Sequence, residues 1–136
     1  KYHPGGALGK RLYLKVADIV VHNQKPEVAP DTDIKKVIVE ISEKMLGVAA
    51  VIDNGRIVGV VTDGDIRRML SKTDSIKGLV AKDIMSANPK TIDLESLAID
   101  ALHLMEKNKI TQLLVTREGQ YEGIIHLHNL IQEGLI

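Results

Sequence analysis

Apolar residues recur at helical spacing in two long segments of the chain, residues 34–45 and 97–105. Apolar positions three or four residues apart form one stripe along a helix, so both segments are predicted to be amphipathic helices that bury this stripe. Two shorter segments, residues 64–71 and 128–134, are predicted to be further helices near the middle and the end of the chain.

Two short apolar runs lie between the helices of each pair. They cover residues 48–52 and 57–62 in the first half of the chain and residues 112–116 and 121–127 in the second. Runs of this length are typical of buried strands. Asn54-Gly55 separates the first two runs and favours a tight hairpin, because both residues tolerate positive φ angles. Each half therefore predicts a helix, a strand, a turn, a strand and a helix.

The two halves of the chain are copies of one unit. Gly59 in the first half matches Gly123 in the second, and the apolar pairs that follow these glycines also match. One unit alone would bury its helices and sheet poorly, which favours two copies packed through their sheets about a pseudo-two-fold axis. The sequence thus predicts an α+β fold with a first repeat at residues 16–74, a second repeat at residues 75–136 and a tail at residues 1–15.

Composition and charge limit the classes of function. Hydrophobic residues make up 44% and charged residues 26% of the chain, as in ordinary globular domains. Lys+Arg and Asp+Glu both number 18, so the chain lacks the basic excess of a nucleic-acid binder. Cysteine is absent, and no apolar run approaches the roughly 20 residues that span a membrane. We expect a cytoplasmic protein that binds neither nucleic acid nor membrane and, because the sequence begins with Lys1, a fragment of a longer protein.

The segment GVVTDGDIRR at residues 59–68 carries the strongest candidate chemistry. It joins a predicted strand to a predicted helix, where unpaired backbone N–H groups attract anions. Thr62 and Asp65 can face one crevice, where the carboxylate accepts hydrogen bonds from both hydroxyls of a ribose. An arginine on the following helix can reach a phosphate. The candidate ligand-binding residues of this corner are Thr62, Asp63, Gly64, Asp65 and Arg67.

A purely structural interpretation of the same residues stays open. Asp63 or Asp65 can cap the helix, and Thr62 can bond its own backbone. Capping explains one carboxylate but does not, in this interpretation, explain the Thr-x-x-Asp spacing. Adjacent arginines on a short helix are also typical of a solvated face. The repeat favours a ligand site, because two such corners would meet across the pseudo-axis.

The sequence Gly59-Val60-Val61-Thr62-Asp63-Gly64-Asp65 resembles the signature of the CBS domain, which is a glycine, two hydrophobic residues, Thr or Ser, two further residues and Asp. The tandem repeat resembles a CBS pair, or Bateman module, over about residues 16–136. This resemblance implies a regulatory module that binds a nucleotide. It places Thr62 near the phosphate and Asp65 on the ribose, with apolar walls from the strand before each hairpin.

The second repeat departs from this signature. Its corner carries His126, His128 and Asn129 where the first corner has a threonine, a glycine and an aspartate. On a strand end the two histidines would project to one side and could donate to phosphate or carboxylate oxygens, although surface histidines without a role remain the alternative. A metal would need further ligands, for which His103 is the nearby candidate, so we expect no metal site. Thr111 precedes a strand at a place where members of the CBS family commonly contact ligands.

The segment HPGGALGKRL at residues 3–12 does not fit a CBS repeat. Together with the sequences TDGDIRR and HLHNL at the two corners, it resembles the D-arabinose 5-phosphate isomerase family. The resemblance implies an upstream sugar-isomerase (SIS) domain that interconverts ribulose 5-phosphate and arabinose 5-phosphate. It also implies an acid or base role for His3 in that domain. The chain holds none of the remaining domain, so the fragment itself is expected to be non-catalytic.

Two hypotheses for the CBS pair stay open. As a sensor, it would bind AMP or ATP, or CMP-Kdo, a product downstream of the isomerase in lipopolysaccharide or capsule synthesis. As an assembly module, it would bind nothing tightly and form a homodimer through apolar stretches such as Val37-Ile38-Val39 and Leu130-Ile131. Neither hypothesis requires a cofactor.

Overall fold

The structure of the chain, a computed structural model, describes residue 9 and residues 11–136. Its elements are α2 (Val16–Val20), β1 (Glu27–Val28), α3 (Ile34–Lys44), β2 (Val48–Asp53), β3 (Arg56–Thr62), α4 (Asp63–Lys72), α5 (Ala81–Ile84), β4 (Thr91–Asp93), α6 (Ala98–Asn108), β5 (Gln112–Arg117), β6 (Gln120–His126) and α7 (Leu127–Gln132). The predicted order of helix, strand, turn, strand and helix is confirmed in both repeats. His3 lies outside the described residues.

The strands form two three-stranded sheets of the same topology, β1-β2-β3 in what we call the first half and β4-β5-β6 in the second half. In each sheet a short strand, β1 or β4, pairs in parallel with the first strand of an antiparallel hairpin. The Asn54-Gly55 turn is confirmed by φ angles of 51° and 80°, and Glu118-Gly119 repeats it at 51° and 81°. The sequence analysis missed β1 and β4, because strands of two and three residues leave no recognisable pattern.

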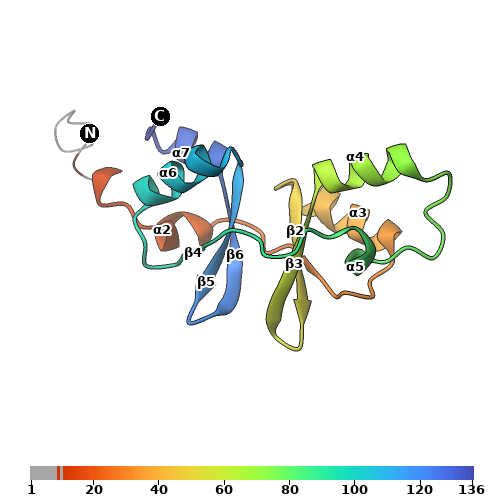
Figure 1. Cartoon of the computed structure of the whole chain (residues 1–136). Helices are drawn as coiled ribbons and strands as arrows, with labels where there is room; N and C mark the ends of the chain where they lie inside the picture. The colour runs from red at the N-terminus through yellow and green to blue at the C-terminus, as the bar shows by residue number, and fades with distance from the viewer. Residues whose placement is uncertain (1–8, 10) are drawn as a thin grey trace.

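Each sequence repeat gives its first short helix to the core of the other half. Helix α2 packs into the second-half core through Val16 and Ile19. Helix α5 packs into the first-half core through Ala81. Figure 1 shows α2 on the side of α6 and α7, and α5 on the side of α3 and α4. The two packed halves therefore do not coincide with the two sequence repeats.

The matched glycines mark the places where these exchanged segments approach the sheets. A Cβ atom added at Gly59 would lie 2.6 Å from Sδ of Met85 and 2.9 Å from the backbone oxygen of Ser86. A Cβ atom added at Gly123 would lie 2.9 Å from a methyl carbon of Val20. Carbon atoms are not tolerated at such distances, so glycine at both positions is explained by close approach.

The two halves meet through the inner faces of their sheets, and the helices cover the outer faces (Figure 1). The shared cluster consists of the buried residues Val48, Ala50, Val60, Leu114, Tyr121 and Ile124. This arrangement confirms the predicted α+β fold with two repeats packed through their sheets. Among the described residues, no helix has the length and apolar character needed to cross a membrane.

The structure exposes only some residues of the apolar stretches that were predicted to form a homodimer surface. Val37 and Leu130 are fully buried, whereas Val39 and Ile131 are 46% and 49% exposed. Neighbouring residues on a helix point about 100° apart, so the members of an apolar run cannot all face the same side. Only part of each predicted apolar stretch is therefore available to a partner.

Replacing Ile19 by Ala is expected to lower the free energy of unfolding by about 2–5 kcal/mol, because this side chain, 5% exposed, fills the second-half core. Val21→Ala is the matched control: Val21 is 72% exposed, and its truncation should change the free energy by less than about 0.5 kcal/mol. Unfolding in urea measures both effects. Equal and small effects would contradict the exchanged packing of α2.

Candidate functional site

A cleft in two parts lies between the halves, beside the corner where β3 passes into α4. The apolar chamber has a volume of about 230 Å³, and the polar chamber has a volume of about 610 Å³. Thr62, Ile110 and Gln112 line both chambers, so the two chambers adjoin. Chambers of this size and mixed character are typical of small-molecule sites.

The apolar chamber is built from both sheets. Val48 and Val60 of the first half face Leu114 of the second half across it. Residues 86–90, which connect α5 to β4, close one side of the chamber. The apolar walls implied by the family resemblance are thus present, and they contain no aromatic ring.

The polar chamber brings together residues that the sequence analysis identified separately in the two repeats. These residues are Thr62, Asp63, Gly64, Arg67, Thr111 and His126. The remaining predicted residues, Asp65, His128 and Asn129, do not line either chamber. Asp65 lies directly behind Thr62 and Ser86, which line the apolar chamber and bond to its carboxylate.

Thr62 and Asp65 form a reciprocal cap on α4. Oγ1 of Thr62 accepts from the Asp65 backbone N–H at 3.1 Å, and Oδ2 of Asp65 accepts from the Thr62 backbone N–H at 2.9 Å. This capping box requires the two residues to be three apart. The expectation that capping leaves the Thr-x-x-Asp spacing unexplained is therefore wrong.

The Asp65 carboxylate has further partners. It is the one buried charged group among the described residues, with 5% of its side chain exposed. Oδ1 accepts from Nη2 of Arg68 at 2.6 Å and from Oγ of Ser86 at 3.2 Å. The Arg68 side chain is 64% exposed, so water can replace Asp65 as its partner at small cost. The buried carboxylate, by contrast, needs other donors wherever these are removed.

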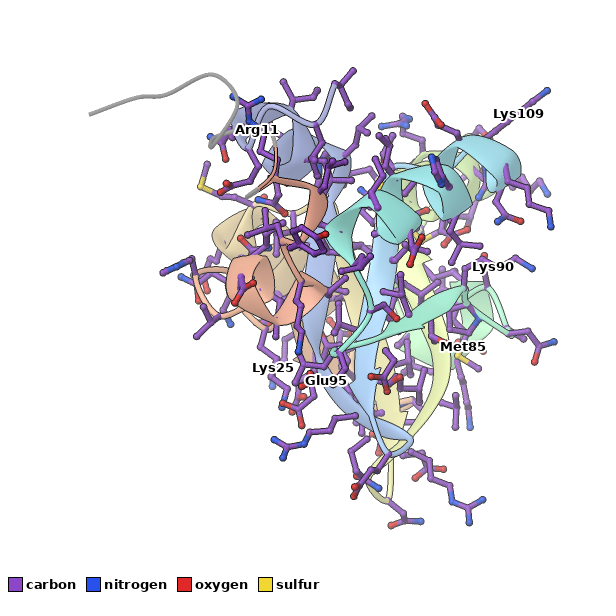
Figure 2. All side chains as sticks on the ribbon, turned by 90° about the vertical axis from the view of Figure 1, so that its left-hand side faces the viewer. Arg11, Lys25, Met85, Lys90, Glu95 and Lys109 are labelled. Carbon is purple, nitrogen blue, oxygen red and sulfur yellow. The ribbon has the colours of Figure 1, made fainter. Side chains whose placement is uncertain are left out.

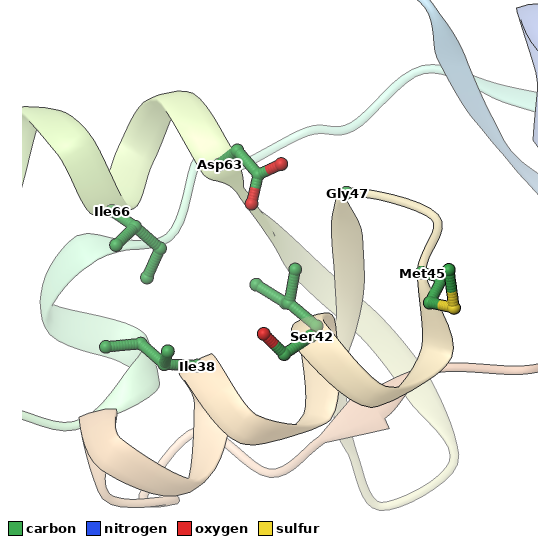
Figure 3. Close-up of a pocket in the computed structure, with 7 residues that line it drawn as sticks. Ile38, Ser42, Met45, Gly47, Asp63 and Ile66 are labelled. Atoms are coloured by element: carbon green, nitrogen blue, oxygen red, sulfur yellow. The ribbon is translucent and has the colours of Figure 1, made fainter.

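Asp63 lies at the boundary between the polar chamber and a second hollow. It also lines a groove of about 350 Å³ between α3 and α4. Figure 3 shows its carboxylate beside Gly47, with Ile38 and Ile66 on the walls of the groove. A Cβ atom at Gly47 would lie 3.2 Å from Oδ2 of Asp63 and 3.0 Å from Nε2 of Gln112, and the φ angle of 72° also favours glycine here.

The second corner repeats the cap with different residues. Oδ1 of Asn129 accepts from the His126 backbone N–H at 2.8 Å, and Nδ1 of His126 accepts from the His128 backbone N–H at 2.9 Å. The expected alternation of both histidines on a strand is wrong, because β6 ends at His126 and His128 lies in the first turn of α7. His126 thus offers only its other ring nitrogen to the polar chamber.

Burial, and next the nearby His128, lower the pKa of His126. At neutral pH its ring is therefore uncharged, with the proton assigned to Nε2 because Nδ1 is an acceptor. His103 is exposed on α6. Within the described part of the chain, no group of three or more potential metal ligands is found.

The sequence analysis missed Gln112, which lines both chambers. Its Nε2 donates to the Leu46 backbone oxygen of the other half at 3.1 Å, and its Oε1 accepts from Oγ1 of Thr111 at 3.0 Å. Comparison of the repeats could have identified it, because the matching position at the start of β2 holds the apolar Val48. A polar side chain at an otherwise apolar strand position indicates a specific role.

A model of the CBS domain family matches residues 16–72 and 81–135. Arabinose 5-phosphate isomerase KdsD of Francisella tularensis is 42% identical over 96% of this chain and 40% of its own length. KdsD of Yersinia pestis is 37% identical over 98% of this chain and 42% of its own length. The chain therefore spans about two fifths of these relatives.

Solved structures share the fold. The CBS domain protein PAE2072 from Pyrobaculum aerophilum, complexed with AMP, has a TM-score of 0.78 at 18% identity and covers 90% of this chain and 100% of its own. CBSX2 from Arabidopsis thaliana, also in complex with AMP, has a TM-score of 0.70 at 25% identity and covers 90% of this chain and 96% of its own.

His126 makes stability depend on pH. Because the pKa of His126 is lower in the folded chain, the unfolded chain takes up the proton more readily. The contribution of His126 to the free energy of unfolding is therefore fully present above the unfolded pKa of about 6.5, and it is lost as the pH falls through the lower folded pKa. We expect the melting temperature to decrease from about pH 7.5 to about pH 5. The decrease should be smaller in His126→Asn, which keeps a cap acceptor without titrating. Equal pH dependence in both proteins would contradict this role.

Proposed function

Since this chain belongs to the CBS domain family, we propose that it is the nucleotide-binding regulatory module of a sugar-phosphate isomerase. The proposal assigns the isomerisation of ribulose 5-phosphate and arabinose 5-phosphate to an SIS domain outside this chain. Support comes from the isomerase relatives, which are more than twice as long as the segment that they share with this chain. The module itself performs no chemistry and acts in the cytoplasm.

The observation that carries this proposal is the division of the cleft into an apolar and a polar chamber. A nucleotide has the same division, with a flat base at one end and a phosphate at the other. Val60 and Leu114 would hold the base between aliphatic walls. Arg67 and the backbone N–H of Gly64 in the first turn of α4 would meet the phosphate in the polar chamber. The AMP complexes of two structural neighbours support a ligand of this class.

The ribose would lie where the chambers adjoin. Thr62 lines both chambers, and Asp65 lies behind it. Ribose hydroxyls would replace Ser86 and Arg68 as donors to the Asp65 carboxylate. A diol matches the two oxygens of a carboxylate, and bonds to a charged acceptor are stronger than neutral ones.

Two ligand classes fit this placement. AMP or ATP would fill the base, ribose and phosphate positions, and two structural neighbours are complexes with AMP. CMP-Kdo offers a ribose, a phosphate and a sugar carboxylate, and the carboxylate would pair with Arg67 or accept from the ring N–H of His126. Feedback by CMP-Kdo would link the isomerase to Kdo synthesis, whereas AMP or ATP would report energy state.

Isothermal titration of the chain with AMP, ATP, CMP and CMP-Kdo tests the proposal. We expect at least one of them to bind and Asp65→Asn to weaken that binding roughly ten- to a hundredfold, the equivalent of one charge-assisted hydrogen bond. The variant should fold, because Asn129 already performs the same capping role in the second corner. Asp65→Asn therefore removes the charge while keeping the cap.

Asp18→Asn is the matched control, because Asp18 caps α2 at the same helical position, away from both chambers. Its affinity should equal that of the unaltered chain. Unchanged binding by Asp65→Asn would show the ribose placement to be wrong. Failure of all four ligands to bind would overturn the sensor and favour a homodimerisation module that uses exposed side chains such as Val39 and Ile131.

A further inference from the structure

The two edges at which the halves meet are not equivalent. A connecting segment crosses between the halves at each edge, residues 86–90 at one and residues 23–26 at the other. Figure 2 shows Lys90 and Lys25, which belong to these segments, on opposite sides of the strands. We call the edge beside residues 86–90 the open seam, because the apolar chamber lies there, and the opposite edge the closed seam.

Tyr121 fills the closed seam. Its side chain is 6% exposed, and its hydroxyl donates to the backbone oxygen of Pro26 at 2.6 Å. The Ala50 backbone N–H donates to the same oxygen at 3.1 Å. Pro26 is thus held by one donor from β6 and one from β2, which belong to different halves. The ammonium group of Lys25 lies 5.4 Å from the centre of the Tyr121 ring and covers it from outside.

Asn23 occupies the corner of the closed seam. Its Nδ2 donates to the Ile124 backbone oxygen at 2.9 Å and to Oδ1 of Asn129 at 3.0 Å. Nδ2 of Asn129 is 3.4 Å from Oδ1 of Asn23 and completes an amide pair. The position that corresponds to the Asp65 carboxylate is therefore neutral, and its amide already has partners.

In the open seam Ser86 contacts Asp65 as Asn23 contacts Asn129, but the closure by Tyr121 has no counterpart. The Lys90 backbone oxygen corresponds to that of Pro26 and accepts from the Leu114 backbone N–H at 3.2 Å. Ile57 corresponds to Tyr121 and has no donor to add. The side chains of Val48, Val60 and Leu114 border the apolar chamber at this edge.

We propose that the chain binds one nucleotide-class ligand, in the open seam, and that Tyr121 together with the Asn23–Asn129 pair closes the second cleft of the pseudo-symmetric pair. The choice of ligand rests on the proposed function. The closure of the second seam does not, and it can be measured without ligand.

Hydrogen exchange of the ¹⁵N-labelled chain, followed by NMR, tests the closure. The Ala50 and Leu114 amides are matched probes, one beneath Tyr121 and one beside the open chamber. We expect Ala50 to exchange more slowly than Leu114 and Tyr121→Phe to speed its exchange relative to Leu114 by about tenfold, the equivalent of one hydrogen bond. A change in global stability affects the exchange of both amides, so the ratio of their exchange rates measures the local effect at the closed seam. An unaltered ratio would overturn the closure.

Titration of the same labelled chain with AMP, and separately with CMP-Kdo, tests the single site. We expect one ligand per chain, with shift changes at Thr62, at residues 86–90 and at Leu114. Two ligands per chain, or shift changes centred on Asn23 and Tyr121, would overturn the proposal. Absence of binding by both, and by ATP and CMP as well, would refute the ligand assignment and the proposed function together, while the exchange ratio would still decide whether the second seam is closed.

Discussion

Burial of the two inner sheet faces against each other decides where the other features of the molecule lie. Each hairpin has one face covered by its helices and one face that only the other sheet can cover. The apolar cluster fills the centre of this contact, so the apolar chamber lies at its edge, where a connecting segment crosses between the halves. The candidate site is a consequence of this packing, and duplication of the unit would produce two equivalent sites if the side chains at both edges were alike.

The exchanged helices add a second constraint. Because α2 and α5 each pack on the half to which their repeat does not belong, neither half is a contiguous segment of chain. The segments that follow these helices must cross beside the sheets, and Gly59 and Gly123 provide the space. The same crossing brings Ser86 to Asp65 and Asn23 to Asn129. Partners from distant parts of the sequence thus complete both corners.

The sequence predicted the repeat, both hairpins, the long helices and the corner of the first repeat, because these features depend on local periodicity and turn chemistry. It could not predict the exchange of α2 and α5, since a short apolar helix fits either core equally well by pattern. Gln112, Tyr121 and Asn23 were missed for a related reason. Their roles depend on contacts across the halves, and only alignment in space shows which of two matched positions carries a donor.

The second corner serves as an internal control for the first. Asn129 caps α7 with a neutral amide in the position that Asp65 holds in α4, so capping alone does not require the charge of Asp65. Removing a carboxylate from water is costly, and the exposed Arg68 offsets only part of that cost. A buried charge with displaceable partners is a poor choice for stability and a good one for binding a diol. The difference between Asp65 and Asn129 therefore favours a ligand at the first corner and a structural role at the second.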